Sequence, residues 1–405
     1  MLERIFNPRN ITKLMDQFFE AAGIRGTNER IDLHTTKKVL VIKLDGIGDM
    51  ILASPLLREL RANLPEAFIT LVVAPHVLNL VELCPYVDEV LTFAWEAGGR
   101  WGHLRRYGRI LSFSVQHLWR QRFELALAPY WEADWYGASA IGYFSGAPRR
   151  VGYSEQVNEW KKIINKGFDN YYTDALRDPV LRHEVDRHLH LLEYVGFKVK
   201  DSSLECWISS EDEISAKRIL HVQDRDAEHP VIIFGIGSCN PKNRWPLDNF
   251  LEVGAWLIKK CQARILVVGG PQDQAAAREL ETQLGQAVLN AAGLLTLRQT
   301  AAMMKQAAFY LGNDTGPMHL AAANNLPVIE ISCHPLKGNP CHARSPQRFG
   351  PWGVPHKILQ PEKPCAPCSQ ECLADQAHCI LNVSIDAVKA ACRKMLKTKA
   401  REVLA

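Results

Sequence analysis

The segment GNDTGPMHLAAANNLPVIEIS, residues 312–332, predicts a strand end, a helix and a second strand in immediate succession. Pro317 stands where the alanine-rich helix begins, a position that suits proline because N–H groups in the first turn are unpaired. Those unpaired donors and the positive end of the helix dipole attract phosphate groups. The other residues of note at this helix start are Asp314, Thr315, Gly316 and His319. Together they predict an anion site, although a structural helix cap would explain Asp314 alone equally well.

The same succession of strand, turn and helix recurs along most of the chain. It first appears in KKVLVIKLDGIGDMILASP, from residue 37, and restarts in PVIIFGIG, from residue 230. Two such blocks in tandem predict an α/β protein with two Rossmann-like domains facing each other across a cleft. The expected divisions are an N-terminal extension (1–37), a first domain (38–205), a second domain (206–382) and a C-terminal helix (383–405). In such sheets, ligands bind outside the carboxyl ends of the strands.

Composition narrows the class of protein. The 405 residues are 47% hydrophobic and 23% charged, with a net charge of +4, which is typical of a globular chain and too weakly basic to indicate nucleic-acid binding. No apolar stretch approaches the ~18 uninterrupted residues of a membrane-spanning helix. The N-terminus, MLERIFNPRN, lacks the pattern of a signal peptide. We therefore expect a cytoplasmic protein whose eleven cysteines are mostly reduced.

A glycine-containing loop in KLDGIGDMILASP joins the first predicted strand to the first helix. Gly46 and Gly48 match the start of a dinucleotide-binding pattern, but Ile51 stands where the third small residue belongs. No acidic residue ends the next strand either, which argues against a nicotinamide-dependent oxidoreductase. Asp49 follows Gly48 at the expected ligand-binding edge, either as a functional carboxylate or as a helix cap.

Two cations follow the first strand of the second domain. In GIGSCNPKNRWPLDNF, Lys242 and Arg244 stand beside a loop of Gly and Ser, which suits a diphosphate. The alternative is a solvent-exposed basic loop that Trp245 anchors by packing.

Five segments along the chain carry a resemblance. They are IKLDGIGDMILASPLLREL, NPKNRWPL, VVGGPQD, LNAAGLLTLRQTAAMMKQA and GNDTGPMHLAAANNLPV. In order and spacing they resemble glycosyltransferase family 9, the ADP-heptose:lipopolysaccharide heptosyltransferase family, over residues of about 40 to 380. The resemblance implies the GT-B architecture of two Rossmann domains. It also implies inverting transfer of a sugar, heptose first, from a nucleotide-diphosphate donor such as ADP-heptose to a lipopolysaccharide-type or related glycolipid acceptor.

The resemblance also implies roles for individual residues. Asp49 matches the family's catalytic base. The residues that match its donor-binding run are Asp314, Thr315, Gly316 and His319. The family's phosphate-binding lysine directly precedes R-W-P or H-W-P, where this chain has Asn243, so Lys242 or Arg244 takes that role. Since inversion needs one in-line attack and one base, no cofactor is expected.

A cysteine-rich segment, CAPCSQECLADQAHC, lies near the C-terminus. Its cysteines are Cys365, Cys368, Cys372 and Cys379. Four thiolates suit zinc, but their spacing is not a standard paired-knuckle pattern. A structural zinc site and a set of buried, reduced thiols are the two alternatives.

The first domain is expected to hold the acceptor, because arginines and aromatic residues are interleaved there. They are Arg100, Arg105, Arg106, Arg109, Arg120, Arg122, Arg149, Arg150, Trp119, Trp131, Trp135 and Tyr136. A phosphorylated glycolipid offers phosphates to arginines and sugar faces to rings, whereas a solvated helix face would explain any single arginine as well. An amphiphilic acceptor favours peripheral contact with the inner face of the cytoplasmic membrane.

Two hypotheses compete with heptose transfer. A sugar-nucleotide-binding homologue without turnover would be expected to have lost the base, whereas Asp49 is present. A transferase of a different sugar in surface polysaccharide synthesis would carry the same motifs.

Overall fold

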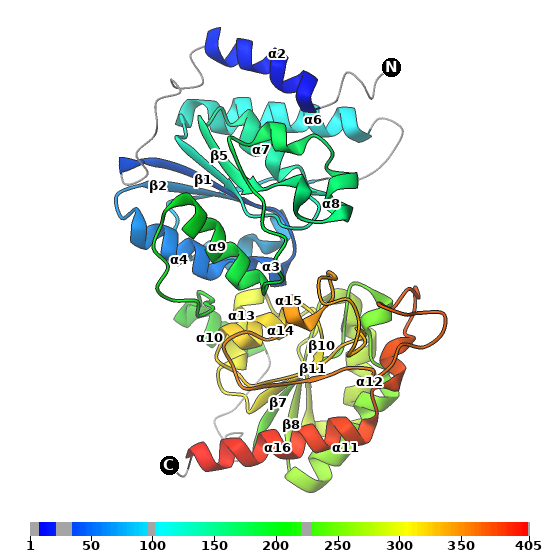
Figure 1. The fold of residues 1–405 in the computed structure, drawn as a ribbon. Helices are drawn as coiled ribbons and strands as arrows, with labels where there is room; N and C mark the ends of the chain where they lie inside the picture. Colours follow the sequence, from blue (N-terminus) through cyan, green and yellow to red (C-terminus); the bar gives the residue numbers. More distant parts are fainter. Residues whose placement is uncertain (1–7, 22–34, 96–101, 220–228, 404–405) are drawn as a thin grey trace. The chain divides into compact units, whose positions relative to one another are not determined.

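The computed structural model describes residues 8–21, 35–95, 102–219 and 229–403. The chain divides into two compact units. Unit 1 comprises Met1–Val180 and Val185–Ser202, and unit 2 comprises Leu181–Glu184 and Ser203–Ala405. Each unit contains one six-stranded sheet with helices on both faces (Figure 1).

The sheet of unit 1 is entirely parallel, with the strand order β3-β2-β1-β4-β5-β6. Its strands are β1 (Lys38–Lys43), β2 (Phe68–Val73), β3 (Glu89–Thr92), β4 (Leu125–Ala128), β5 (Arg149–Tyr153) and β6 (Asp174–Leu176). β1 and β4 are buried along almost their whole length, as expected for central parallel strands covered on both faces.

The helices of unit 1 alternate with these strands. They are α2 (Pro8–Ala21), α3 (Ile47–Leu52), α4 (Ser54–Asn63), α5 (Leu78–Val81), α6 (Gly102–Phe113), α7 (Ala138–Phe144), α8 (Glu159–Ile164) and α9 (Glu184–Val195), whose first residue belongs to unit 2. The N-terminal helix α2 packs on the body of the unit. Its Phe19 is fully buried in edge contact with Trp119, and the Tyr143 hydroxyl donates a hydrogen bond to Asp16 Oδ1 at 2.6 Å.

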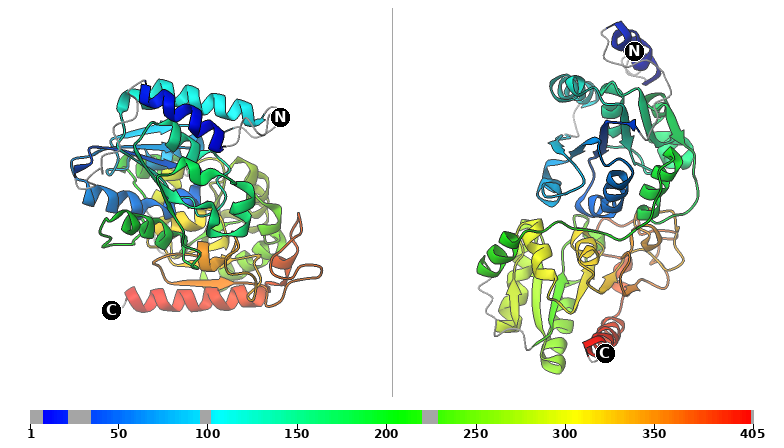
Figure 2. Two further views of the ribbon diagram at one scale, coloured as in Figure 1. Left: turned by 45° about the horizontal axis from the view of Figure 1, so that its top comes forward. Right: turned by 90° about the vertical axis from the view of Figure 1, so that its left-hand side faces the viewer.

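Unit 2 repeats the architecture with the strand order β12-β11-β10-β7-β8-β9, again all parallel. Helices cover both faces of this sheet as well (Figure 2). Its strands are β7 (Val231–Gly235), β8 (Arg264–Val268), β9 (Val288–Asn290), β10 (Phe309–Asn313), β11 (Val328–Ile331) and β12 (His356–Leu359). Its helices are α10 (Ser210–Ile219), α11 (Leu247–Cys261), α12 (Gln274–Leu284), α13 (Leu297–Met304), α14 (Gly316–Ala323), α15 (Pro346–Phe349) and α16 (Ile385–Val403). Two parallel sheets confirm the predicted α/β class.

Both sheets reverse their strand order at one internal point. In unit 1 the chain builds β1, β2 and β3 in one direction and then adds β4 on the other side of β1. In unit 2 the reversal falls between β7 and β10. Ligands of open α/β sheets bind outside the carboxyl ends of the strands at such a reversal, so each unit has one expected binding edge. None of the helices in the described parts of the chain is both long and apolar enough to cross a membrane.

The strands β7 and β10 approach each other through paired glycines. Gly235 lies opposite Gly312 in the sheet register. A Cβ atom on Gly312 would lie 2.8 Å from the Cα of Gly235 and closer still to its carbonyl oxygen. Since backbone cannot move aside as a side chain can, only glycine fits at this point of the binding edge.

We expect Gly312→Ala to lower the free energy of unfolding by about 1–3 kcal/mol, the usual cost of overpacking. Urea denaturation measures this, with Gly108→Ala as the matched control. Gly108 lies in α6, and a methyl group added there would meet no atom within 4 Å, so that substitution should stabilise the protein by about 0.5–1 kcal/mol. Equal stability of Gly312→Ala and the parent protein would contradict the close approach.

Candidate functional site

The binding edge of unit 2 is organised by the fully buried side chain of Asn313 at the end of β10. Its Nδ2 donates to the carbonyl oxygen of Ile236 at 2.8 Å, and its Oδ1 accepts from the backbone N–H of Trp245 at 3.1 Å. One amide therefore holds the loop after β7 and the start of the segment leading to α11 against the end of β10.

The predicted donor-binding residues come together at the N-terminal end of α14. Thr315 is the N-cap residue, and Gly316 and Pro317 form the first two helical positions, as the sequence predicted. His319 lies one turn inside the helix and is buried, with its Nε2 3.9 Å from Asp314 Oδ1. The edge thus combines a helix N-terminus with an acid and an imidazole.

Burial determines the charges at this edge. It raises the pKa of Asp314 to about 6, an effect that the charge of Arg344 opposes. Burial and the proximity of His183 lower the pKa of His319 to about 3, so its imidazole is neutral at pH 7. Glu330 on β11 is fully buried, and burial together with Asp314 raises its pKa well above the usual range. A protonated Glu330 reduces the negative charge that an incoming anion would meet.

The structure separates the two cations that the sequence placed side by side. Lys242 Nζ donates to the carbonyl oxygen of Cys372 at 2.6 Å and so ties down the cysteine-rich segment. Arg244 Nε donates to the carbonyl oxygen of Ser238, in the loop after β7, at 2.8 Å. Its charge also opposes the rise of the Asp273 pKa that burial causes, so Arg244 lies on the ligand-binding edge.

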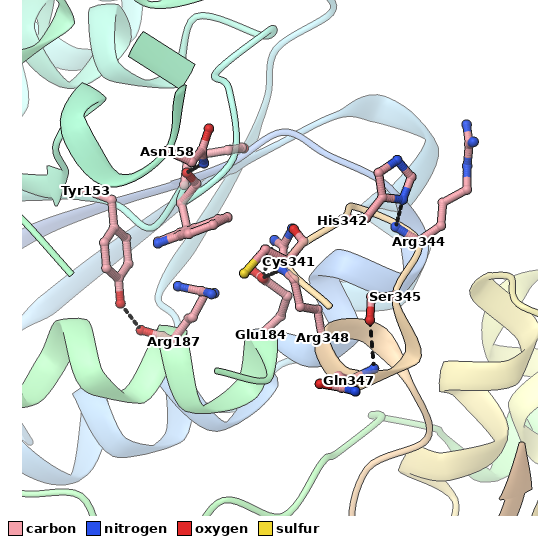
Figure 3. Close-up of polar contacts among 12 residues, drawn as sticks. Tyr153, Asn158, Glu184, Arg187, Cys341, His342, Arg344, Ser345, Gln347 and Arg348 are labelled. Atoms are coloured by element: carbon pink, nitrogen blue, oxygen red, sulfur yellow. Dashed lines mark hydrogen bonds and ion pairs between the residues drawn. The ribbon is translucent and has the colours of Figure 1, made fainter. Parts of the chain in front are cut away.

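A third cation, Arg344, was missed in the sequence. It lies between β11 and α15, and its backbone N–H donates to His342 Nδ1 at 3.1 Å (Figure 3). In this view its side chain extends away from Ser345 and Arg348. No motif marks it, because only the folding of this loop brings its charge near Asp314.

Buried contacts within unit 2 anchor the loop that carries Arg344. Arg348 is fully buried, and its Nε donates to Glu184 Oε1 at 3.0 Å (Figure 3). Its Nη1 donates to the carbonyl oxygen of Cys341 at 2.9 Å. The ring of His183 stacks on Trp352, with centroids 4.5 Å apart. The loop is therefore held at both sides of Arg344.

The cysteine-rich segment forms a compact group of ligand atoms. The group consists of Cys368, Cys372, His378 and Cys379, whose candidate ligand atoms all lie within 4.8 Å of one another. This corrects the expected four-cysteine set, because Cys365 is not part of it. The Cys365 sulfur instead accepts a hydrogen bond from Asn382 Nδ2 at 3.1 Å. The sequence signal for His378 is its position directly before Cys379.

The binding edge of unit 1 carries two aspartates with different surroundings. Asp45 pairs with the buried Lys43, Nζ to Oδ2, at 2.9 Å and accepts from the Tyr130 hydroxyl at 3.2 Å. Asp49 is the third residue of α3, and its Oδ2 accepts from the backbone N–H of Gly46 at 3.2 Å. A Cβ on Gly46 would lie 3.2 Å from the same oxygen, so glycine leaves room for this carboxylate. Asp49 is partly exposed.

Glycine positions in α3 differ from the expected loop. Gly46 is the N-cap residue in an extended conformation, and Gly48 lies within the first turn of the helix. Asp49 therefore belongs to a capping arrangement at the start of α3.

Several of the predicted acceptor-binding side chains are structural. Arg150 is buried, and its Nε donates to the carbonyl oxygen of Tyr171 at 2.8 Å. The indole N–H groups of Trp119 and Trp131 donate to the carbonyl oxygens of Phe144 and Asp178. The polar atoms of these three side chains therefore satisfy backbone carbonyl groups, and their contact with the acceptor stays a prediction. Arg100 lies outside the described residues.

The sequence model of glycosyltransferase family 9 (heptosyltransferase) matches residues 116–378. Lipopolysaccharide heptosyltransferase 2 of Escherichia coli is 25% identical over 304 residues, 73% of this chain and 82% of the relative. The lipopolysaccharide core heptosyltransferase OpsX of Haemophilus influenzae is 22% identical over 75% of this chain and 82% of its own length.

Solved structures show the same fold. A family 9 glycosyl transferase from Veillonella parvula superposes with a TM-score of 0.71 at 21% identity, covering 92% of this chain and all of that one. The ADP-heptose lps heptosyltransferase II of Escherichia coli gives 0.66 at 19% identity, covering 90% of this chain and 99% of the other. The fold and the matched motifs define a glycosyltransferase of the GT-B type. Since the family model matches more than half of its length, the chain belongs to glycosyltransferase family 9.

Proposed function

We propose that this enzyme transfers heptose, with inversion, from an ADP-heptose-like donor to a lipopolysaccharide-type glycolipid acceptor. The observation that carries the proposal is the Asp314-to-His319 run at the strand-order reversal of unit 2, in a chain of family 9. Its relatives are lipopolysaccharide heptosyltransferases, and they suggest the sugar and the acceptor class. A different sugar or a related surface glycolipid is the alternative that the same site would support.

The donor's diphosphate is proposed to bind unit 2 at the N-terminal end of α14. Backbone N–H groups of the first turn and the helix dipole favour its negative charge. Arg244 on the loop after β7 and Arg344 beside Asp314 supply cations, while Lys242 is engaged with Cys372. As the bond to the sugar breaks, charge builds on the diphosphate, and these groups stabilise it. Thr315 and the neutral His319 add polar contacts to the donor.

The acceptor is proposed to bind unit 1 with its hydroxyl at Asp49. A hydroxyl is a poor nucleophile until its proton begins to leave, and a carboxylate within hydrogen-bond reach can take that proton. Asp49 and Asp45 are both partly exposed, and Asp45 pairs with the buried Lys43. One base and one in-line attack give inversion, and the chemistry calls on no cofactor.

Asp49→Asn keeps the size and the capping oxygen but loses the basicity. We expect kcat to fall by about 10²–10⁴ with the affinity for ADP unchanged. Transfer from ADP-heptose to a lipopolysaccharide-core acceptor, followed by mass spectrometry, measures the first quantity, and calorimetric titration with ADP measures the second.

Asp45→Asn is the matched control for that substitution. It removes the carboxylate charge that pairs with the buried Lys43, so it should destabilise the protein by about 3 kcal/mol. Turnover of Asp49→Asn within a few-fold of the parent, with a folded but inactive Asp45→Asn, would transfer the role of base to Asp45. An inactive parent that still binds ADP would favour a non-catalytic homologue.

We further propose that Cys368, Cys372, His378 and Cys379 hold a structural zinc ion. Three thiolates and one imidazole form an established tetrahedral zinc set, and atoms within 4.8 Å of one another can share a single ion. The backbone N–H of Leu373 also donates to the Cys368 sulfur at 3.3 Å, which suits a thiolate ligand. Such an ion would fix the segment on which Lys242 is anchored.

The purified protein should then contain about one equivalent of metal, measured by inductively coupled plasma mass spectrometry. Cys379→Ser should lose the metal and lower the melting temperature, because metal binding contributes to folding stability. Cys365→Ser, a neighbouring cysteine outside the group, should keep it. A metal-free parent protein with an unchanged melting temperature after chelation would leave only reduced thiols.

Peripheral contact with the cytoplasmic face of a membrane is proposed for unit 1. Trp135, Trp160 and Ile163 are 43%, 55% and 67% exposed, and the rings of Trp135 and Trp160 lie 6.3 Å apart. The exposed Lys162 and Lys166 flank Ile163. Tryptophans prefer the interface between lipid and water, and lysines are attracted to anionic headgroups.

The double variant Trp160→Ala/Ile163→Ala should reduce the fraction of protein that floats with vesicles containing anionic lipid. Raising the salt concentration should reduce it further, because it screens the lysines. Leu294→Ala removes a comparably exposed apolar side chain, 51% exposed, from unit 2 and should change nothing. Equal flotation of the double variant and the parent would exclude this surface.

A further inference from the structure

Three side chains from distant parts of the sequence form a continuous row in unit 1. Trp95 follows β3, Arg106 lies in α6, and Tyr136 lies in the loop between β4 and α7. The guanidinium carbon of Arg106 is 5.1 Å from the centre of the Trp95 ring. The Trp95 ring in turn meets the Tyr136 ring nearly edge-on, with centroids 5.4 Å apart and an interplanar angle of 76°.

A glycine gives Arg106 its place in this row. Gly137 has a positive φ of 84°, and a Cβ added to it would lie 3.7 Å from Arg106 Cδ and 3.0 Å from Ile110 Cδ1. The absence of a side chain at this turn lets the arginine stem lie against the backbone before α7.

The row ends beside the proposed base. The loop after β4 is joined to the loop after β1 through Tyr130, whose hydroxyl donates to Asp45 Oδ1 and accepts from the backbone N–H of Leu44. Tyr136, farther along the same loop, is close enough to Asp45 and Asp49 for both charges to help raise its pKa, which burial raises most, to about 12. The Tyr136 hydroxyl therefore stays protonated, as a donor.

Two donors in the row are shielded from solvent without an acceptor. Within the described parts of the chain, neither Trp95 Nε1 nor Arg106 Nε has a hydrogen-bond partner. Asp134 is the charge that most opposes the lowering of the Arg106 pKa by burial. Both Asp134 oxygens, however, already accept hydrogen bonds from backbone N–H groups of the turn into α7. A donor that is shielded from water and lacks an acceptor raises the free energy of the folded protein. A bound group that accepts hydrogen bonds from such donors therefore binds more tightly.

We propose that Arg106 and the indole N–H of Trp95 form a subsite for an anionic oxygen group, a carboxylate or a phosphate, carried by the acceptor. The proposal rests on the proposed function, because it takes the ligand to be the acceptor whose hydroxyl meets Asp49. A planar guanidinium presents several N–H donors in one fork and suits either anion. The rings of Trp95 and Tyr136 offer apolar faces to a sugar next to that anion.

The geometry favours this role over a purely structural one for Arg106. Arg150, a structural arginine of the same unit, donates hydrogen bonds to the carbonyl oxygens of Tyr171 and Ala147. The Nε of Arg106 has no such hydrogen bond within the described chain, although burial lowers the pKa of this guanidinium from the usual value. A cation held partly out of water, with a donor left unused, is placed to bind an anion.

The Trp95 indole N–H gives a direct readout by NMR of the 15N-tryptophan-labelled protein, with Trp95→Phe assigning its signal. The probe is an inner-core oligosaccharide released from lipopolysaccharide, used untreated, after phosphatase treatment and after esterification of its carboxylates. We expect the untreated oligosaccharide to shift the Trp95 signal. The treatment that abolishes the shift identifies the anion as phosphate or carboxylate.

Arg106→Gln should abolish that shift and raise the KM for the acceptor about tenfold or more, the usual effect of losing a charged hydrogen bond, with the ADP affinity unchanged. Lys198→Gln removes an exposed cation of unit 1 that lies outside the proposed sites, so this variant should behave as the parent in both measurements. Oligosaccharide binding that shifts other signals but leaves Trp95 unmoved, or an unchanged KM in Arg106→Gln, would overturn the subsite alone. If the oligosaccharide shifts no signal while ADP still binds, the proposed acceptor class fails and the subsite with it.

Discussion

The amide of Asn313 is the contact on which the binding edge of unit 2 depends. It is buried at the end of β10 and holds the loop after β7 with one end and the backbone of Trp245 with the other. Trp245 is itself buried, and its indole donates to the carbonyl oxygen of Val383 at 3.0 Å. Because these hydrogen bonds are shielded from water, losing the amide would leave buried backbone groups without partners. The start of α14 is thereby fixed relative to the loops around it.

Close packing of backbone supports the same edge. Gly235 and Gly312 allow β7 and β10 to meet where a side chain would collide with backbone. The strand-order reversal then places the ends of both strands at one edge, with α14 starting there. A phosphate site made from backbone N–H groups needs this rigidity, since its donors are fixed by the fold and not by flexible side chains.

Burial also sets the electrostatics of both edges. In unit 2 it keeps His319 neutral and raises the pKa of Glu330 well above its usual range. A protonated Glu330 moderates the repulsion of an anionic donor. In unit 1 burial keeps the hydroxyl of Tyr136 protonated beside two aspartates. The binding edge of unit 2 therefore suits a diphosphate, and the binding edge of unit 1 suits a hydroxyl that must lose a proton.

The sequence by itself determined the α/β class, the family and the start of α14, because these depend on local periodicity and on turn and capping residues adjacent in the chain. It named Asp49, Asp314 and His319 for the same reason. Tertiary structure decided the partner of each cation. Lys242 donates to the carbonyl oxygen of Cys372, and Arg150 donates to buried backbone. The charge of Arg344 lies near Asp314, and the guanidinium of Arg106 lies over the ring of Trp95. Tertiary structure also replaced Cys365 by His378 in the ligand group. Long side chains and loops take partners far away in sequence, and no local pattern encodes which partner the fold will bring within reach.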